Sequence, residues 1–221
     1  MKKRYIPFFL LLSALCSCNN KPTDHFVLRG TIPGATDSTE IVLSPAGKYS
    51  HKIAQGFIVN GKFELQGKVD QPTYCRLSMN DQDILDRSDS QQHSRYMEID
   101  FFVENGELTF QTPHIDSLPE SFWRYDVRKE KNYTLTGSPT QEIFYRYQQQ
   151  TIPSRHGIRL LEQHLLKDAN PEDYKTLTKT KSELEAQTKE FIRQHHNLLV
   201  NLYLVNQLKK EPFTYDQAYL D

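Results

Sequence analysis

The fold class is decided by residues 57–67, which read Phe57-Ile58-Val59-Asn60-Gly61-Lys62-Phe63-Glu64-Leu65-Gln66-Gly67. Asn-Gly between two alternating segments is the strongest short signal for a β-hairpin, because a type I′ turn needs two positive φ angles. After the turn, Phe63, Leu65 and Val69 fall on one face of a strand, and polar side chains fall on the other. The stretch therefore predicts a hairpin with one buried face.

The same period of two runs through residues 25–137. Phe26, Leu28 and Ile32 share one face, and Cys75, Leu77 and Met79 share another. A second hairpin is predicted around Asn105-Gly106, and 133–136 makes a last strand. About eight short strands separated by turn residues predict an antiparallel β-sandwich or barrel.

Residues 138–221 have helical spacing instead. Ser138-Pro139-Thr140-Gln141 is a capping box with proline at the first helical position, and Asn170-Pro171 opens a second helix. Pro153 and Gly157 are expected to break or kink the first helix, and leucines from 198 onward continue on another helix. We therefore predict an α+β fold, with the β-sandwich or barrel followed by an α-helical hairpin.

The N-terminus has the features of a lipoprotein signal. Three basic residues at 2–4 precede an apolar run over 5–15, which is too short to span a bilayer. Leu15-Cys16-Ser17-Cys18 then matches a lipobox, with Cys18 as the lipidated residue. We expect a signal peptide over 1–17, a lipidated tether over 18–24, and a position in the cell envelope of a Gram-negative bacterium, facing the periplasm or the cell surface. An ordinary cleaved signal is the alternative.

Composition limits the partners. The chain has 221 residues, with 27 Lys+Arg against 28 Asp+Glu, so it lacks the basic surface that binds nucleic acid. Without the three basic residues of the signal, 24 basic and 28 acidic side chains leave a charge near −4. The N-terminal lipid, rather than charge, is therefore the expected membrane partner. Three cysteines exclude a disulfide scaffold.

The sequence predicts no catalytic or metal centre and no cofactor. Cys75 lies on an apolar strand face, which favours a buried core thiol, while Arg76 points the other way. The adjacent His195 and His196 diverge by about 100° on a helix and cannot share an ion. Glu98 and Asp100 share a strand face that we interpret as a polar outer face.

One acidic loop and one aromatic loop complete the candidates. Asp81, Asp83, Asp86 and Asp89 lack the central glycine and distal glutamate of an EF-hand loop, which favours a solvated loop over a calcium site. The second loop could stack a sugar or anchor a peptide, or it could cover one end of the sandwich. Its candidate ligand-binding residues are Phe122, Trp123, Arg124 and Tyr125.

The order of these motifs resembles a known family. Together they are similar to the N-terminal domain of unknown function, of DUF4369 type, that is found in thioredoxin-like lipoproteins. The segments that carry the resemblance are the pattern Phe-x-Leu-x-Gly-x-Ile over 26–32, the Asn60-Gly61-Lys62-Phe63 turn, the segment 102–106 and Leu135 to Gln141. In those lipoproteins the helices lead into a thioredoxin domain with a Cys-x-x-Cys site. No cysteine follows Cys75 here, so the redox residues of that family have no counterpart in this sequence.

Three hypotheses follow for the function. The first is a membrane-anchored lipoprotein module, not an enzyme, with a binding or scaffolding role toward an unknown protein or glycan. The second is the truncated N-terminal part of a thioredoxin-like thiol–disulfide oxidoreductase. The third is a glycan-binding lipoprotein.

Overall fold

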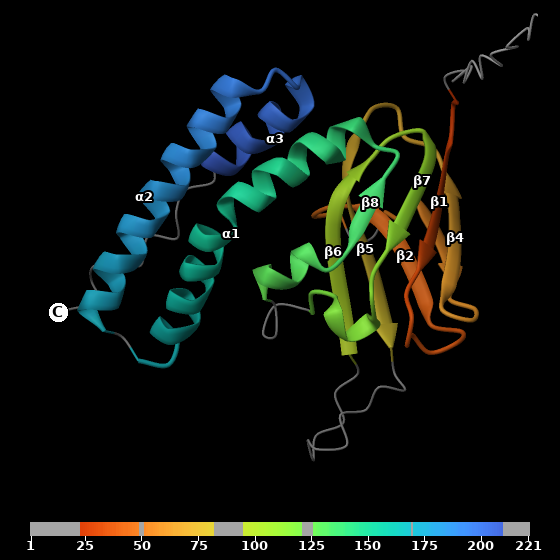
Figure 1. Cartoon of the computed structure of the whole chain (residues 1–221), viewed down its shortest axis with the longest axis horizontal. Coiled ribbons are helices and arrows are strands. Elements are labelled where there is room, and N and C mark those ends of the chain that lie inside the picture. The colour runs from red at the N-terminus through yellow and green to blue at the C-terminus, as the bar shows by residue number, and fades with distance from the viewer. Residues whose placement is uncertain (1–22, 49–50, 82–94, 121–125, 169, 210–221) are drawn as a thin grey trace, which may run out of the picture.

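The computed structural model describes residues 23–48, 51–81, 95–120, 126–168 and 170–209. In this part of the chain, eight strands form two four-stranded sheets, and three helices follow them. Figure 1 shows the sheets stacked as a sandwich with the helices on one side, beyond β5 and β6. The predicted α+β fold is confirmed, as a sandwich rather than a closed barrel.

The two sheets have the orders β4-β1-β7-β8 and β3-β2-β5-β6. The strands of the first are β1 (Phe26–Thr31), β4 (Lys62–Gly67), β7 (Gly106–Gln111) and β8 (Thr134–Thr136). Those of the second are β2 (Glu40–Pro45), β3 (Ala54–Phe57), β5 (Thr73–Asp81) and β6 (Arg95–Val103). The second sheet is antiparallel, but β1 pairs parallel with β7, so the expectation of a purely antiparallel sandwich is corrected.

Both Asn-Gly turns connect strands of different sheets. Asn60 and Gly61 have φ of 52° and 67°, as a type I′ turn requires, and Val59 N donates to Lys62 O over 2.8 Å. Beyond this pair, β3 joins β2 and β4 joins β1. The turn at 105–106 likewise joins β6 to β7 of the other sheet. The two predicted hairpins are therefore wrong as pairings, because alternation fixes which face is buried and not which strand is the neighbour.

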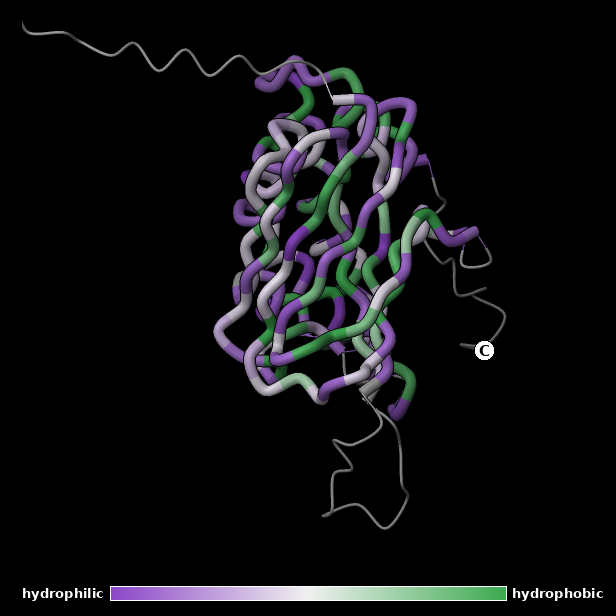
Figure 2. Tube along the Cα trace, turned by 90° about the vertical axis from the view of Figure 1, so that its right-hand side faces the viewer, coloured by the Kyte–Doolittle hydropathy of each residue, from purple (hydrophilic) through white to green (hydrophobic). Residues whose placement is uncertain are grey.

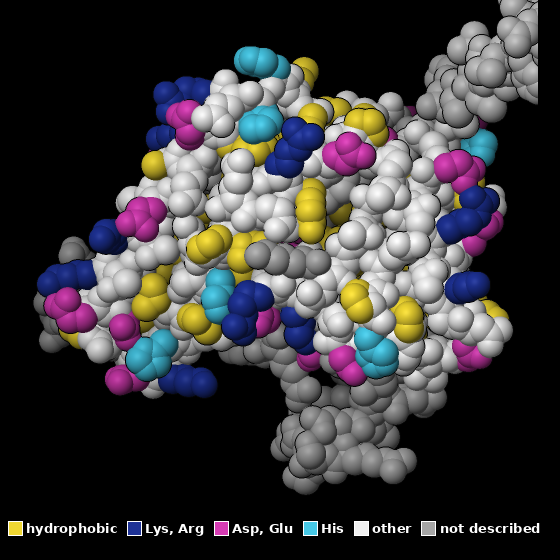
Figure 3. Space-filling model, in the orientation of Figure 1, with side chains coloured by type: hydrophobic (Ala, Val, Ile, Leu, Met, Phe, Trp, Pro, Cys, Tyr) yellow, Lys and Arg dark blue, Asp and Glu magenta, His cyan; other side chains and the backbone are white. Residues whose placement is uncertain are grey.

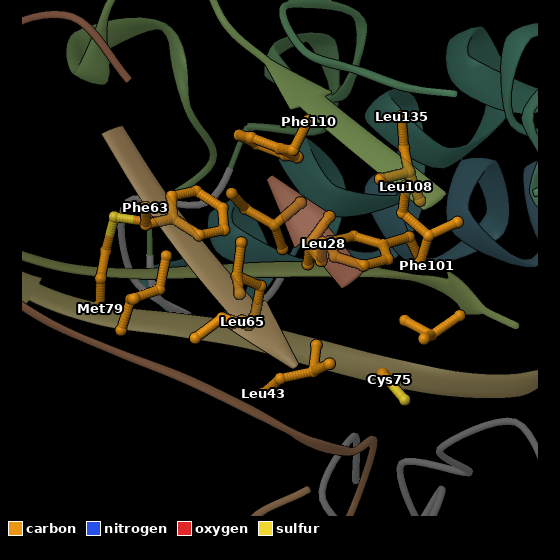
Figure 4. Packing of buried hydrophobic residues seen from close by; sticks show 14 of the residues in the cluster. Leu28, Leu43, Phe63, Leu65, Cys75, Met79, Phe101, Leu108, Phe110 and Leu135 are labelled. Carbon is orange, nitrogen blue, oxygen red and sulfur yellow. The ribbon is translucent and has the colours of Figure 1, made fainter. Parts of the chain in front are cut away.

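The main core lies between the two sheets. Its fully buried side chains include Phe26, Leu28, Leu77, Phe101 and Phe110. Figure 4 shows such side chains converging from both layers, and Figure 2 shows hydropathy alternating along the strands. The period-two interpretation of the sequence is confirmed at these positions.

The helices are α1 (Pro139–Leu165), α2 (Pro171–Gln194) and α3 (Leu198–Lys209). Ser138 caps α1, since its Oγ accepts from Gln141 N over 3.1 Å, and Asn170 caps α2. Pro153 lies inside α1, which remains one helix and changes direction in its middle (Figure 1). The sequence predicted that this region would either break or kink the helix, and the structure shows the kink (Figure 1).

A second apolar cluster attaches the helices to the outer face of β5 and β6. It contains Phe102 of β6, Phe144 and Tyr147 of α1, Phe191 of α2 and Leu204 of α3, with Tyr74 of β5 packed against it. The edge of β6 is covered as well, because Gln141 Oε1 accepts from Phe102 N over 2.8 Å. The helices therefore bury a sheet face and an edge that would otherwise meet water.

Candidate functional site

A cleft of about 740 Å³ lies between the outer face of β5 and β6 and the helices. That volume is in the range of small-molecule binding sites, roughly 300–1,000 Å³. Figure 3 shows hydrophobic side chains at the junction of the helices and the sandwich. The strands supply Tyr74, Arg76, Glu98 and Asp100, the connection before α1 supplies Glu120, Glu130 and Tyr133, and the helices supply Phe144, Tyr147, Gln148, Arg155, Arg159, Leu184, Tyr203, Leu204 and Gln207.

An ion-paired triad on the two strands makes one wall. Arg76 lies opposite Asp100 in the β5–β6 register. Its Nε and Nη2 donate to the two Asp100 oxygens over 2.6 and 2.8 Å, and its Nη1 donates to Glu98 over 2.8 Å. All three side chains are about three-quarters buried or more. Glu98 and Asp100 thus lie on a polar outer face of the sheet, as predicted, and the helices cover that face.

A second ion pair lies deeper in the cleft. Glu130, which is 7% exposed, pairs with Arg155 of α1 and also accepts from Gln148 Nε2 over 3.4 Å. Burial raises the pKa of the Glu130 carboxyl, and the charge of Arg155 opposes that effect. Burial also disfavours the charged guanidinium of Arg155, but Glu130 outweighs this and the pKa of Arg155 is raised. Each partner thus favours the charged form of the other against the effect of burial.

Charges in the cleft balance. Three arginines and four carboxylates line it. Lys129 supplies a fourth cation, because its Nζ lies 3.1 Å from Oε1 of Glu120. Desolvated charges are costly unless they are paired, so this balance is what burial under the helices requires. A ligand in the cleft therefore meets hydrogen-bonding groups, but the balanced charges favour neither an anionic nor a cationic ligand.

Tyrosine rings form the apolar part of the cleft. Tyr74 and Tyr203 lie with their ring centroids 4.2 Å apart, and Phe144 meets both rings edge-on at 5.4 Å. Burial raises the pKa of Tyr203 to about 12 and holds the pKa of Tyr74 well above its usual value. Both hydroxyls therefore stay protonated at neutral pH, so each can donate and accept a hydrogen bond.

The structure tests only some of the residues proposed from the sequence. Cys18 and the aromatic loop residues Phe122, Trp123, Arg124 and Tyr125 lie outside the described residues, as do three of the four loop aspartates. Cys75 is fully buried, and burial followed by the charge of Asp100 raises the pKa of its thiol to about 12. The core-thiol prediction is confirmed.

The histidines and possible metal ligands can be compared across the same part of the chain. Within the described residues, no three His, Cys, Asp or Glu side chains gather as a metal site. His195 stacks on Phe191 at 3.9 Å between ring centroids, and His164 bonds Asp173 over 2.6 Å. These two histidines thus have packing and hydrogen-bonding roles.

Sequence reasoning missed most of the cleft. Tyr74, Glu130, Arg155 and Tyr203 were not candidates, because they lie on four separate elements. The one available signal was the set of polar residues Arg76, Glu98 and Asp100, which alternation places on the same side of neighbouring strands. Their pairing depends on the β5–β6 register, which the sequence does not specify.

Among the described helices, none combines the length and the hydropathy needed to cross a membrane.

Comparisons with known proteins assign the β-rich part of the chain to a family. A search of curated proteins finds no match. The family described as "Domain of unknown function (DUF4369)" matches residues 26–144, more than half of the chain, from β1 to the first turns of α1. The chain therefore belongs to the DUF4369 family, whose defining domain has no assigned function.

Proposed function

We propose that this protein is a lipid-anchored binding module of the cell envelope, without catalysis of its own, and that the cleft between the sandwich and the helices holds its ligand. The cleft carries the proposal, because about 740 Å³ of space lined by paired charges and tyrosines suits recognition. The lipobox at Cys18 supplies the anchor, facing the periplasm or the cell surface.

The lining of the cleft favours a small, neutral molecule rich in hydroxyl groups, such as a sugar. The balanced charges give no preference for an ionic ligand. Each Asp100 oxygen accepts one bond from Arg76, and a carboxylate has about four acceptor sites, so hydroxyl donors find further acceptors there. The Tyr203 and Tyr74 rings add faces against which a sugar ring can pack. The glycan hypothesis is thereby centred on the cleft rather than on Trp123.

The oxidoreductase hypothesis gains no support from the thiol in the described part of the chain. A reactive cysteine needs an exposed thiolate with a lowered pKa, whereas Cys75 is fully buried and its pKa is raised to about 12. If this chain acts in redox chemistry, the reactive thiols must come from outside its described residues.

Glycan-array binding followed by calorimetry with the bound sugar tests the ligand. Tyr203→Ala should weaken binding by about tenfold, the worth of one aromatic packing contact. Gln207→Ala changes an exposed cleft residue, so we expect the fold to be kept and binding to be weakened as well. Phe57→Ala, on an exposed ring outside the cleft, is the matched control. A chain that binds neutral sugars unchanged by both cleft substitutions would refute this site.

Cell fractionation tests the anchor. Cys18→Ala should move the protein from the membrane fraction to the soluble fraction, because the acyl chains supply the attachment. A Cys18→Ala protein that remains in the membrane fraction would contradict the lipoprotein assignment.

A further inference from the structure

Helix α3 carries apolar side chains on two opposite faces. Val200 and Leu204 are buried in the second apolar cluster. On the other face, Leu198 is 70% exposed and Leu202 is 51% exposed, one turn apart. The sequence of α3 contains no acidic residue, and its only charge is Lys209 at the end. A two-sided apolar helix at a surface indicates that its outer face meets an apolar environment.

The start of α3 is fixed rather than frayed. Asn197 Oδ1 accepts from Val200 N over 3.0 Å, which caps the helix. Asn201 Nδ2 donates to His195 O over 2.7 Å and so ties α3 to the end of α2. Leu198 and Leu202 are therefore presented on a rigid support, and their exposure belongs to the folded state.

The position of α3 relative to the N-terminus identifies the apolar environment. The α2–α3 corner and the start of β1 both lie at the upper end of the molecule in Figure 1. Cys18 is eight residues before Phe26, and an extended chain spans at most about 3.6 Å per residue, so the lipid lies within about 29 Å of the start of β1. The anchor thus holds this end toward the bilayer.

The opposite end supplies a comparison on the same molecule. In the β1–β4 register Phe26 lies beside Gly67 and Thr31 beside Lys62, so the turn before β4 is at the far end of β1. Phe57 and Val59, near that turn, are 61% and 58% exposed. They match the α3 leucines in exposure and differ in their distance from the anchor.

We propose that the outer face of α3 rests on the lipid bilayer, with Leu198 and Leu202 inserted among the headgroups as a second contact beside the N-terminal lipid. This inference depends on the anchor in the proposed function and goes beyond it, because it sets the orientation of the protein. Insertion desolvates no carboxylate of α3, and Lys209 can extend its ammonium to the headgroup layer. The far end of the sandwich then points away from the membrane.

Site-specific fluorescence tests the orientation on the full lipidated chain. Leu198→Cys, Leu202→Cys and the control Phe57→Cys are each labelled with an environment-sensitive dye, while buried Cys75 and acylated Cys18 do not react. The protein is reconstituted in vesicles of phosphatidylethanolamine and phosphatidylglycerol that carry a lipid-borne quencher. Dyes at 198 and 202 should shift to the blue and be quenched at least about twofold more than the dye at 57.

Flotation of the same vesicles separates the two proposals. Lipidated protein that floats but shows equal quenching at 198, 202 and 57 overturns the α3 contact and leaves the anchor intact. Protein that does not float overturns the anchor and, with it, the orientation. Cys18→Ala protein labelled at 198 should lose most of the quenching, because two leucines alone hold a protein weakly at a membrane.

Discussion

Replacing Arg155 by methionine should destabilise the protein in a way that depends on pH. Glu130 would then keep its burial and lose its guanidinium partner. Removing one partner of a buried ion pair costs about 3–5 kcal/mol, and the 19% exposure of the Arg155 side chain argues for a somewhat smaller value, roughly 2–3 kcal/mol. For a chain of this size that corresponds to a fall in Tm of about 4–12 °C.

The pH dependence follows from the pKa of Glu130. Its pKa is raised in the folded protein, so the folded state binds this proton more tightly than the unfolded state does. Its contribution to stability is therefore greatest below the unfolded value of 4.5 and decreases as the pH rises through the folded pKa. Without Arg155 that pKa rises further, so protonation relieves more of the cost of burying the carboxyl at pH 5 than at pH 8.

Thermal and urea unfolding at pH 5 and pH 8 measure the effect. Arg155→Met should lower stability more at pH 8, and Arg155→Met combined with Glu130→Gln should recover more than half of the loss. Arg193→Met is the matched control, since the Arg193 side chain is 74% exposed and pairs with Glu190 at the surface. Equal losses at both pH values, or no recovery in the double variant, would refute the argument.

Substitutions at two positions and one reactivity measurement test the local structure. Gly137→Ala should destabilise by about 2 kcal/mol or more in urea unfolding, because φ is 91° and a Cβ would lie 2.1 Å from Glu107 O; a loss below about 0.5 kcal/mol would contradict this. Ser138→Ala removes the cap of α1 and should cost about 1–2 kcal/mol by the same assay, whereas Ser138→Thr should keep most of the cap. Cys75 should react with a thiol reagent only in denaturant, and rapid reaction in the native protein would be evidence against its burial.

The sequence predicts which residues face the core but not which strands are neighbours. Alternation placed Phe63, Leu65 and Cys75 inward, and the structure buries all three. The Asn60-Gly61 turn has the predicted backbone, whereas at 105–106 only Gly106 has a positive φ; both turns cross between sheets, because a turn fixes only the residues directly beside it. The parallel pairing of β1 with β7 depends on contacts about 80 residues apart, which no local pattern encodes.

The sequence did not predict the cleft for a related reason. Arg76, Glu98 and Asp100 occupy the polar side of β5 and β6, and a polar strand face is equally compatible with water or with a covering layer that leaves room for a ligand. What distinguishes the two is the helical layer, which is held by Tyr74 and Phe102 of the sheet against Phe144 and Tyr203. Aromatic residues in that pattern look like scattered surface rings until the docking of the helices is known.

The family match covers the strand residues of the cleft but not most of its helix residues. Residues 26–144 include Tyr74, Arg76 and Asp100 from the strands, whereas Arg155 and Tyr203 of the helices lie outside the match. The matched domain therefore provides one wall of paired charges, and the helices of this particular chain complete the space in which a ligand would sit. Because specificity arises from the groups that close around a ligand, we expect helix substitutions to alter ligand preference and strand substitutions such as Arg76→Met to abolish binding altogether.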